Sequence, residues 1–184
     1  MEDFASNVIK QCALSNCGMC TFMEQIGPTL LGVKPASIIN IRQQKCLELC
    51  HELFSKDSPV AYIAIEDQQK NRLLFLYHKE RLAEVLSDRR VTKYLARLGY
   101  PAQGTTEEYV AELAQRLRKN GFPHEIGVFM GYPLKDVYGF MGARIPYRKT
   151  MGWRMYGDTR ASEAVYHQFK NARSHVKSML LACQ

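Results

Sequence analysis

The sequence predicts an α+β fold in which a small, mostly antiparallel sheet is covered by five or more helices. Residues 60–65 and 72–77 are rich in aliphatic and aromatic side chains and flank a polar loop, which is the pattern of an antiparallel hairpin. A third stretch, residues 29–41, is mostly apolar and predicts a strand or extended turn that adds to this sheet. Helical apolar spacing elsewhere predicts the covering layers.

The length and composition favour a single domain. At 184 residues, of which 46% are hydrophobic and 23% charged, the chain can bury a core of its own, with residues 1–26 as a candidate helical appendage. The start of the chain is acidic and lacks the basic, then apolar, pattern of a secretory signal. No apolar run reaches the about 18 residues that span a bilayer. We therefore expect a cytoplasmic protein with no membrane partner.

Apolar spacing in the first third of the chain predicts helical segments at residues 2–14, 21–26 and 42–55. Gly27 and Pro28 predict a break after the second of them, because this pair is a strong helix breaker. Gly32 and Pro35 interrupt the apolar stretch that follows, which is why an extended conformation is expected there.

After the hairpin, helix start and stop residues mark the next elements. A helix is expected over residues 79–86, and Asp88 is expected to cap another helix that Gly99 ends. Thr105 and Glu108 have the spacing of a capping box, in which a hydroxyl and a carboxylate bind the free backbone donors of a helix start. A last helix is predicted after Asp158 or Thr159, running close to residue 181.

Residues 122–140, FPHEIGVFMGYPLKDVYGF, predict two short helices that meet at a Gly-Tyr-Pro corner. Proline suits the first turn of a helix and Glu125 favours its positive end, so helix punctuation explains much of the stretch. His124 and Tyr132 are the members that this punctuation leaves unexplained. They are therefore the part of the stretch that points to function.

A basic segment precedes the last helix. The net charge of the chain is +7, and residues 144–156, expected to be a loop, interleave cations with aromatic side chains. The cations of this loop are Arg144, Arg148, Lys149 and Arg154. Such a loop is a candidate anion-binding site. A basic module that binds nucleic acid or protein is one alternative function.

The stretch at residues 122–140 resembles the signature of an uncharacterised family of small proteins from clostridia and related anaerobic bacteria. GPTLLGVKPA at 27–36 resembles the family's Pro-Thr-Leu-x-Gly-x-Lys element, and WRMYGD at 153–158 resembles its Trp-Lys-Val-Tyr-Gly-Asp element. The chain departs from the family at Ile26, where a cysteine is frequent, and in the loop at 144–152. The resemblance covers the chain and implies no known reaction.

The resemblance brings together residue types that can bind and protonate a small polar or anionic ligand. His124 is a candidate general acid or base, Lys34 a candidate anion clamp, and Glu125 a candidate orienting carboxylate. The further candidate ligand-binding residues are Thr29, Tyr132, Trp153, Tyr156, Asp158 and Arg148. Structural roles compete with these, since Asp158 suits a helix cap and Lys34 a solvated surface. We expect a ligand-binding domain without a cofactor, and catalysis is left open.

The cysteines allow a second alternative, a metal or redox protein. Cys12, Cys17 and Cys20 have the spacing found in plant-type ferredoxins, and Cys50 stands where a fourth thiolate would be needed. These four residues are candidate ligands for an iron–sulfur cluster or zinc. Against this, Cys46 and Cys50 fall on one face of a predicted amphipathic helix, where cysteine behaves as a small core hydrophobe. Reduced thiols are the competing interpretation.

Overall fold

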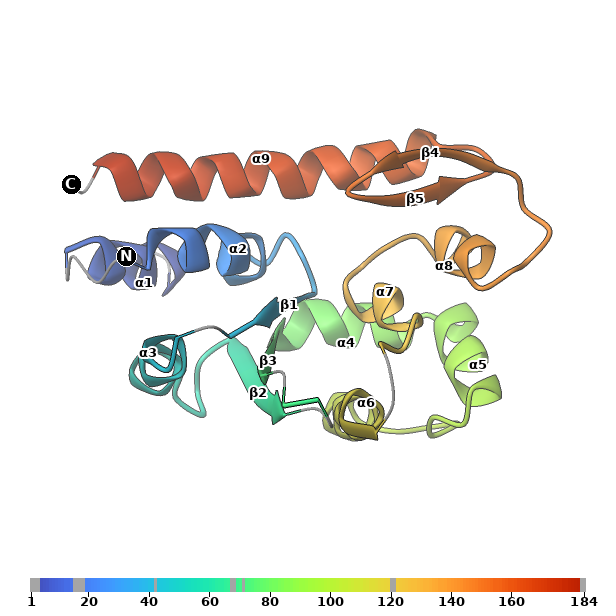
Figure 1. Cartoon of the computed structure of the whole chain (residues 1–184), viewed down its shortest axis with the longest axis horizontal. Helices are drawn as coiled ribbons and strands as arrows, with labels where there is room; N and C mark the ends of the chain where they lie inside the picture. The colour runs from blue at the N-terminus through green and yellow to red at the C-terminus, as the bar shows by residue number, and fades with distance from the viewer. Residues whose placement is uncertain are drawn as a thin grey trace.

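A computed structural model describes residues 4–14, 19–41, 43–66, 69–70, 72–119 and 122–182, and it has the predicted α+β fold (Figure 1). The elements in chain order are α1 (Phe4–Leu14), α2 (Cys20–Leu30), β1 (Ala36–Asn40), α3 (Lys45–Leu53), β2 (Val60–Glu66), β3 (Arg72–His78), α4 (Lys79–Ser87), α5 (Arg89–Arg97), α6 (Thr106–Lys119), α7 (Ile126–Phe129), α8 (Leu134–Phe140), β4 (Tyr147–Met151), β5 (Trp153–Tyr156) and α9 (Arg160–Ala182). Within these described ranges no helix is both long and apolar enough to cross a membrane.

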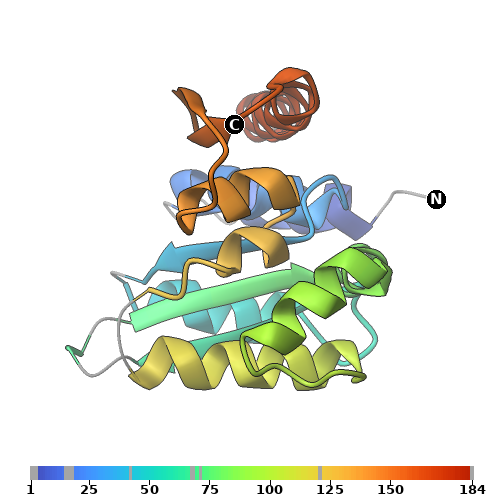
Figure 2. The same ribbon diagram turned by 90° about the vertical axis from the view of Figure 1, so that its right-hand side faces the viewer.

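The main sheet is antiparallel with the strand order β1-β3-β2, so the predicted hairpin forms and β1 joins it on the β3 side. The strand expected within residues 29–41 occupies its last part, β1. Figure 2 shows α1 and α2 on one side of the sheet, α6 on the other, and α9 beyond α2. The layers therefore follow the order α9, α2, sheet, α6.

The sheet separates two hydrophobic cores, and the central strand β3 contributes to both. Leu74 and Leu76 point into a core formed with α1, α2, α3 and α9. Leu73, Phe75 and Tyr77 point into a core formed with helices α4 to α8. This alternation follows from the two-residue period of a strand, which sends successive side chains to opposite faces of the sheet. Because helices cover both faces, the side chains on both faces of β3 are apolar from Leu73 to Tyr77.

The predicted break at Gly27 and Pro28 is wrong, because α2 continues through both residues to Leu30. Gly27 packs so closely on α9 that a Cβ there would lie 2.5 Å from Cγ2 of Val176. A glycine before proline also has no Cβ to clash with the proline ring, so the helical conformation stays accessible. The close helix contact favours continuing the helix, and a sequence pattern does not reveal it.

Two predicted helix starts are confirmed by their hydrogen bonds. The Thr105 backbone N–H donates to Oε2 of Glu108 at 2.7 Å, and the Glu108 N–H donates to Oγ1 of Thr105 at 3.2 Å. Asp88 accepts from the backbone N–H of Arg90 at 2.8 Å. Gly99, with a φ of +90°, ends α5 as predicted.

The basic segment at residues 144–156 is not the loop that was predicted, because it forms the hairpin of β4 and β5. Gly152, with a φ of +72°, stands at its turn. The hairpin packs on α8, where Tyr156 lies against the Cα of Gly139 with no space for a side chain. Its strands are short and bear charged residues at exposed positions. The alternation of apolar and polar residues is therefore too short to predict a strand from the sequence.

The stretch at 122–140 forms the predicted corner between two short helices. α7 is shorter than expected and begins only at Ile126, with His124 and Glu125 in the turn before it. Gly131 has a φ of +78°, and Pro133 stands at the start of α8. The corner places Tyr132 beside Trp153 of the β4-β5 hairpin.

Candidate functional site

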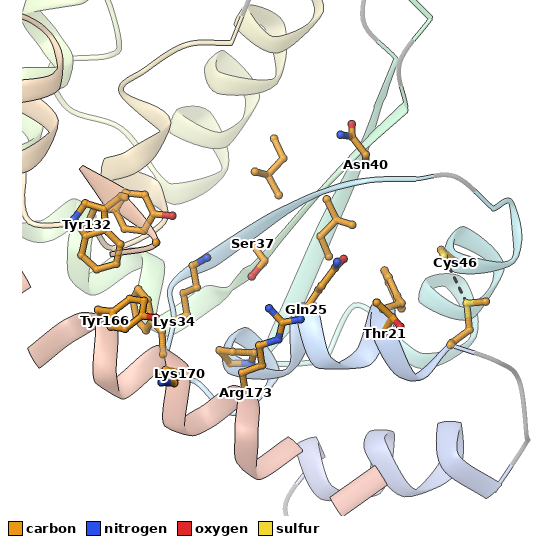
Figure 3. A pocket seen from close by; sticks show the side chains of 18 of the residues that line it. Thr21, Gln25, Lys34, Ser37, Asn40, Cys46, Tyr132, Tyr166, Lys170 and Arg173 are labelled. Atoms are coloured by element: carbon orange, nitrogen blue, oxygen red, sulfur yellow. Dashed lines mark hydrogen bonds between the residues drawn. The ribbon is translucent and has the colours of Figure 1, made fainter. Parts of the chain in front are cut away.

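A pocket of about 860 Å³ borders β1, α2 and α9 (Figure 3). One end is formed by Tyr132 of the Gly-Tyr-Pro corner and Trp153 at the start of β5. In the view of Figure 3 the polar ends of Lys34, Ser37 and Arg173 point toward the same central space. The pocket thus joins three of the segments that carry the family resemblance.

Lys34 enters the pocket from the turn between α2 and β1. Its ammonium lies 5.9 Å from the ring centroid of Tyr132 and 5.6 Å from that of Phe169, within the range of cation–π contacts. No carboxylate of the described residues forms an ion pair with it. Burial of the amine lowers the pKa of Lys34 to about 8. This lysine is therefore a partly desolvated cation that aromatic rings, not acids, surround.

Two more cations come from α9, where Lys170 and Arg173 line the pocket. Arg173 has a carboxylate 3.7 Å away, on Glu24, which lies outside the lining. Of the described residues that line the pocket, none is an aspartate or a glutamate. The electrostatic potential inside is consequently positive.

Thr29 lies behind the pocket wall. It is fully buried, and its hydroxyl shares a 2.8 Å hydrogen bond with the hydroxyl of Ser37, which lines the pocket. This bond ties the last turn of α2 to β1 and fixes the Ser37 rotamer. Thr29 therefore contacts the pocket wall through Ser37.

The aromatic end of the pocket is a stacked pair. The rings of Tyr132 and Trp153 are nearly parallel, at 15°, with centroids 4.3 Å apart. Gly131 holds the preceding turn against Pro35, where a Cβ on the glycine would lie 2.7 Å from Cδ of the proline. The corner therefore fixes the position of Tyr132 relative to β1.

Asp136 of α8 holds the other ring. Its side chain is 1% exposed and accepts the Trp153 indole N–H at 2.9 Å and the Tyr156 backbone N–H at 2.9 Å. Lys135 and Ser162 donate to the same carboxylate at 2.6 Å each. Burial alone would raise the pKa of Asp136, but these hydrogen bonds outweigh it and lower the pKa. The sequence interpretation missed this residue, although an aspartate beside the apolar face of α8 was a usable signal.

His124 and Glu125 do not line the pocket. Glu125 is buried and accepts the hydroxyl of Tyr100 at 3.1 Å and the guanidinium of Arg116 at 3.3 Å, so it holds α7 to the second core. His124 is exposed, with its ring edge-on to Phe140 at 4.8 Å. The structure thus places Lys34 apart from the other two residues that were candidates for catalysis.

Three of the candidate ligand-binding residues also lie elsewhere. Tyr156 packs on α8, and Asp158 accepts the backbone N–H of Arg160 at 3.1 Å at the start of α9, the structural role that competed for it. Arg148 is exposed on β4. Lys34, Tyr132 and Trp153 are the candidates that meet in the pocket itself.

The pocket-lining face of α9 was missed by the sequence interpretation, yet it has a pattern. Its members recur at intervals of three and four residues, and they are Tyr166, Phe169, Lys170 and Arg173. Such a stripe shares one side of a helix. Aromatic and cationic side chains on one stripe are the signal that could have identified this wall.

The cysteine alternative has little support in the described chain. Cys12, Cys46 and Cys50 are buried in the first core, Cys20 packs against it, and Cys17 lies outside the described residues. Burial, with a smaller contribution from Cys46, raises the pKa of the Cys50 thiol to about 12, which opposes the thiolate that a metal requires. The described residues contain no group of three or more His, Cys, Asp or Glu that could hold a metal ion.

A family model described as a protein of unknown function (DUF3793) matches residues 22–184. No curated protein and no solved structure matches the chain.

Proposed function

The chain belongs to the DUF3793 family, whose function is unknown, and we propose that it binds a small anionic ligand in the pocket around Lys34. The observation that carries the proposal is a lysine whose ammonium lies in the pocket between aromatic rings, with no acidic partner in the described chain. A desolvated charge without a partner is unfavourable, and a bound anion removes that penalty.

The other pocket residues suit the same ligand. Arg173 offers a planar donor that matches a carboxylate or phosphate, and Ser37 and Gln25 offer uncharged hydrogen bonds. The stacked rings of Tyr132 and Trp153 provide a flat apolar surface for the rest of the molecule. A few polar groups in a partly apolar pocket is the usual composition of a ligand site.

A cytoplasmic location is part of the proposal. The burial of Cys12, Cys46 and Cys50 in the apolar core, where cysteine behaves as a small hydrophobe, suits reduced thiols and therefore a reducing compartment. Cell fractionation tests this point directly.

Ligand binding can be followed through the fluorescence of Trp153, because the chain contains a single tryptophan. We expect small dicarboxylates or phosphate to quench it saturably, and Lys34→Ala to weaken binding by about tenfold or more, which corresponds to loss of one charge-assisted contact. Lys93→Ala is the matched control, because it removes the same charge from an exposed position on α5. Equal affinities in Lys34→Ala and wild type would rule out the proposed site.

A further inference from the structure

β1 is an edge strand, and its hydrogen bonds show which backbone groups face outward. The Ile41 N–H donates to the Arg72 carbonyl at 2.7 Å, and the His78 N–H donates to the Pro35 carbonyl at 2.9 Å. In an antiparallel pair, residues that bond the partner strand alternate with residues that do not. Odd-numbered residues along β1 therefore bond β3, and even-numbered residues direct their N–H and C=O groups away from the sheet.

The outward edge borders the pocket. Four consecutive residues of β1, 37–40, line it, although their side chains alternate between the two faces of the sheet. What these four residues share is the backbone edge of β1 that faces away from β3. Ile38 and Asn40 direct their backbone N–H and C=O groups to this edge, where no described residue accepts or donates a hydrogen bond to them. Unpaired edges of this kind are templates for another strand.

We propose that the ligand of this pocket is an extended acidic peptide segment that pairs with the outer edge of β1 as a fourth strand and places a carboxylate at Lys34. This inference rests on the proposed function, because it names the ligand class of the same site. Main-chain hydrogen bonds to an edge strand supply affinity in such complexes, and side-chain pockets supply specificity.

Charge and length favour this occupant over a compact anion. Lys34, Lys170 and Arg173 are spread along the pocket with no acid in the described lining, so several carboxylates at intervals complement them. β1 spans about 13 Å over its five residues, at about 3.3 Å per step. A single phosphate has no backbone groups that could pair with the outward groups of Ile38 and Asn40, whereas an extended acidic segment can pair with them and reach the cations as well.

The decisive experiment uses the acetylated hexapeptide EVEVEV and two N-methylated isomers, one methylated at its three glutamate nitrogens and the other at its three valine nitrogens. In an extended peptide these two sets of N–H groups point to opposite edges. We expect one isomer to bind about tenfold more weakly than the parent peptide, since it loses about two hydrogen bonds, and the other to bind within threefold. Equal affinities of the two isomers would exclude strand pairing.

Succinate, measured by the same Trp153 fluorescence, separates this inference from the proposed function. If succinate binds and depends on Lys34 but the isomers do not differ, the anion site stands and the strand pairing is wrong. If neither succinate nor the peptide binds, the proposed function itself fails. Tighter binding of the parent peptide than of succinate, with a difference between isomers, supports both.

A protein variant tests the same edge from the other side. Ile38→Pro removes one outward N–H and leaves the bonds between β1 and β3, because Ile38 does not donate to β3; proline is tolerated at such edge positions. Ile38→Val is the control that keeps the N–H. We expect Ile38→Pro to bind the peptide several-fold more weakly than Ile38→Val does. An unchanged peptide affinity in folded Ile38→Pro contradicts the proposal, and the peptide isomers decide the question if that variant fails to fold.

Discussion

Trp153 donates its indole N–H to the carboxylate of Asp136 across 2.9 Å, so a buried charge on α8 orients the ring that closes one end of the pocket. The two residues are neighbours only through the packing of the β4-β5 hairpin on α8. The geometry of the pocket's aromatic end therefore depends on a residue that does not line it.

Asp136→Asn should destabilise the protein by about 2 kcal/mol, because the amide presents a donor where Lys135, Ser162 and Trp153 all donate. Urea unfolding followed by circular dichroism measures the change, and a red shift of tryptophan emission reports release of the ring. Asp158→Asn is the control, because asparagine is an equally good partner for a backbone N–H at a helix start. Equal stability of the Asp136 variant and wild type would show that the network is not needed.

The same carboxylate should contribute to the pH dependence of stability. The pKa of Asp136 is lowered in the folded protein. Its contribution to the free energy of unfolding is therefore complete above the pKa of the unfolded state, about 3.9, and is lost as pH falls through the pKa of the folded state. We expect the difference in unfolding free energy between wild type and Asp136→Asn to be constant from pH 7 to 5 and to shrink below about pH 4. Other acids titrate in both proteins and cancel. A difference that stays constant to pH 2 would contradict the assignment.

Anion affinity should fall in mildly alkaline solution. The pKa of Lys34 is lowered to about 8 by burial, so the amine begins to lose its charge there, and a bound anion shifts the loss upward. With sulfate as the probe, which keeps its charge, affinity should be flat below pH 7 and decline above pH 8. Lys34→Arg should remain flat to about pH 10, since arginine stays protonated. A wild-type profile without decline would place the binding cation elsewhere.

The contact of α2 with α9 can be tested with a double-mutant cycle. Gly27→Ala should cost about 2 kcal/mol, because its Cβ would lie 2.5 Å from Cγ2 of Val176. Val176→Ala opens space at the same point. The double variant should therefore lose at least about 1 kcal/mol less unfolding free energy than the two single variants lose in total. Thermal unfolding of the four proteins provides the measurement. Additive effects would mean that the two residues do not share one packing site.

Local signals were enough to predict much of the fold. The hairpin of β2 and β3 and the capping box of Thr105 and Glu108 depend on residues close together in the chain, and both were predicted correctly. The continuation of α2 through Pro28 was not, because it depends on Val176 far along the chain. The β4-β5 hairpin likewise depends on packing against α8.

Part of the candidate site could also be predicted. The family resemblance pointed to Lys34, Tyr132 and Trp153, and all three line one pocket. Glu125 looked equally functional, but its partners, Tyr100 in the loop after α5 and Arg116 in α6, make it a core contact. Which polar residue meets a cavity and which meets the core is decided by tertiary packing, and spacing along the chain does not encode it.

The two helices that border the pocket come from distant parts of the chain, α2 near its start and α9 near its end. During translation, the ribosome makes α2 and the whole sheet before α9 emerges. Until then Phe22, Met23 and Ile26 of α2 lack the helix that carries Val176 and Leu180. The pocket is thus complete only when synthesis reaches α9, and a chain released early would expose an apolar helix face to chaperones and proteases.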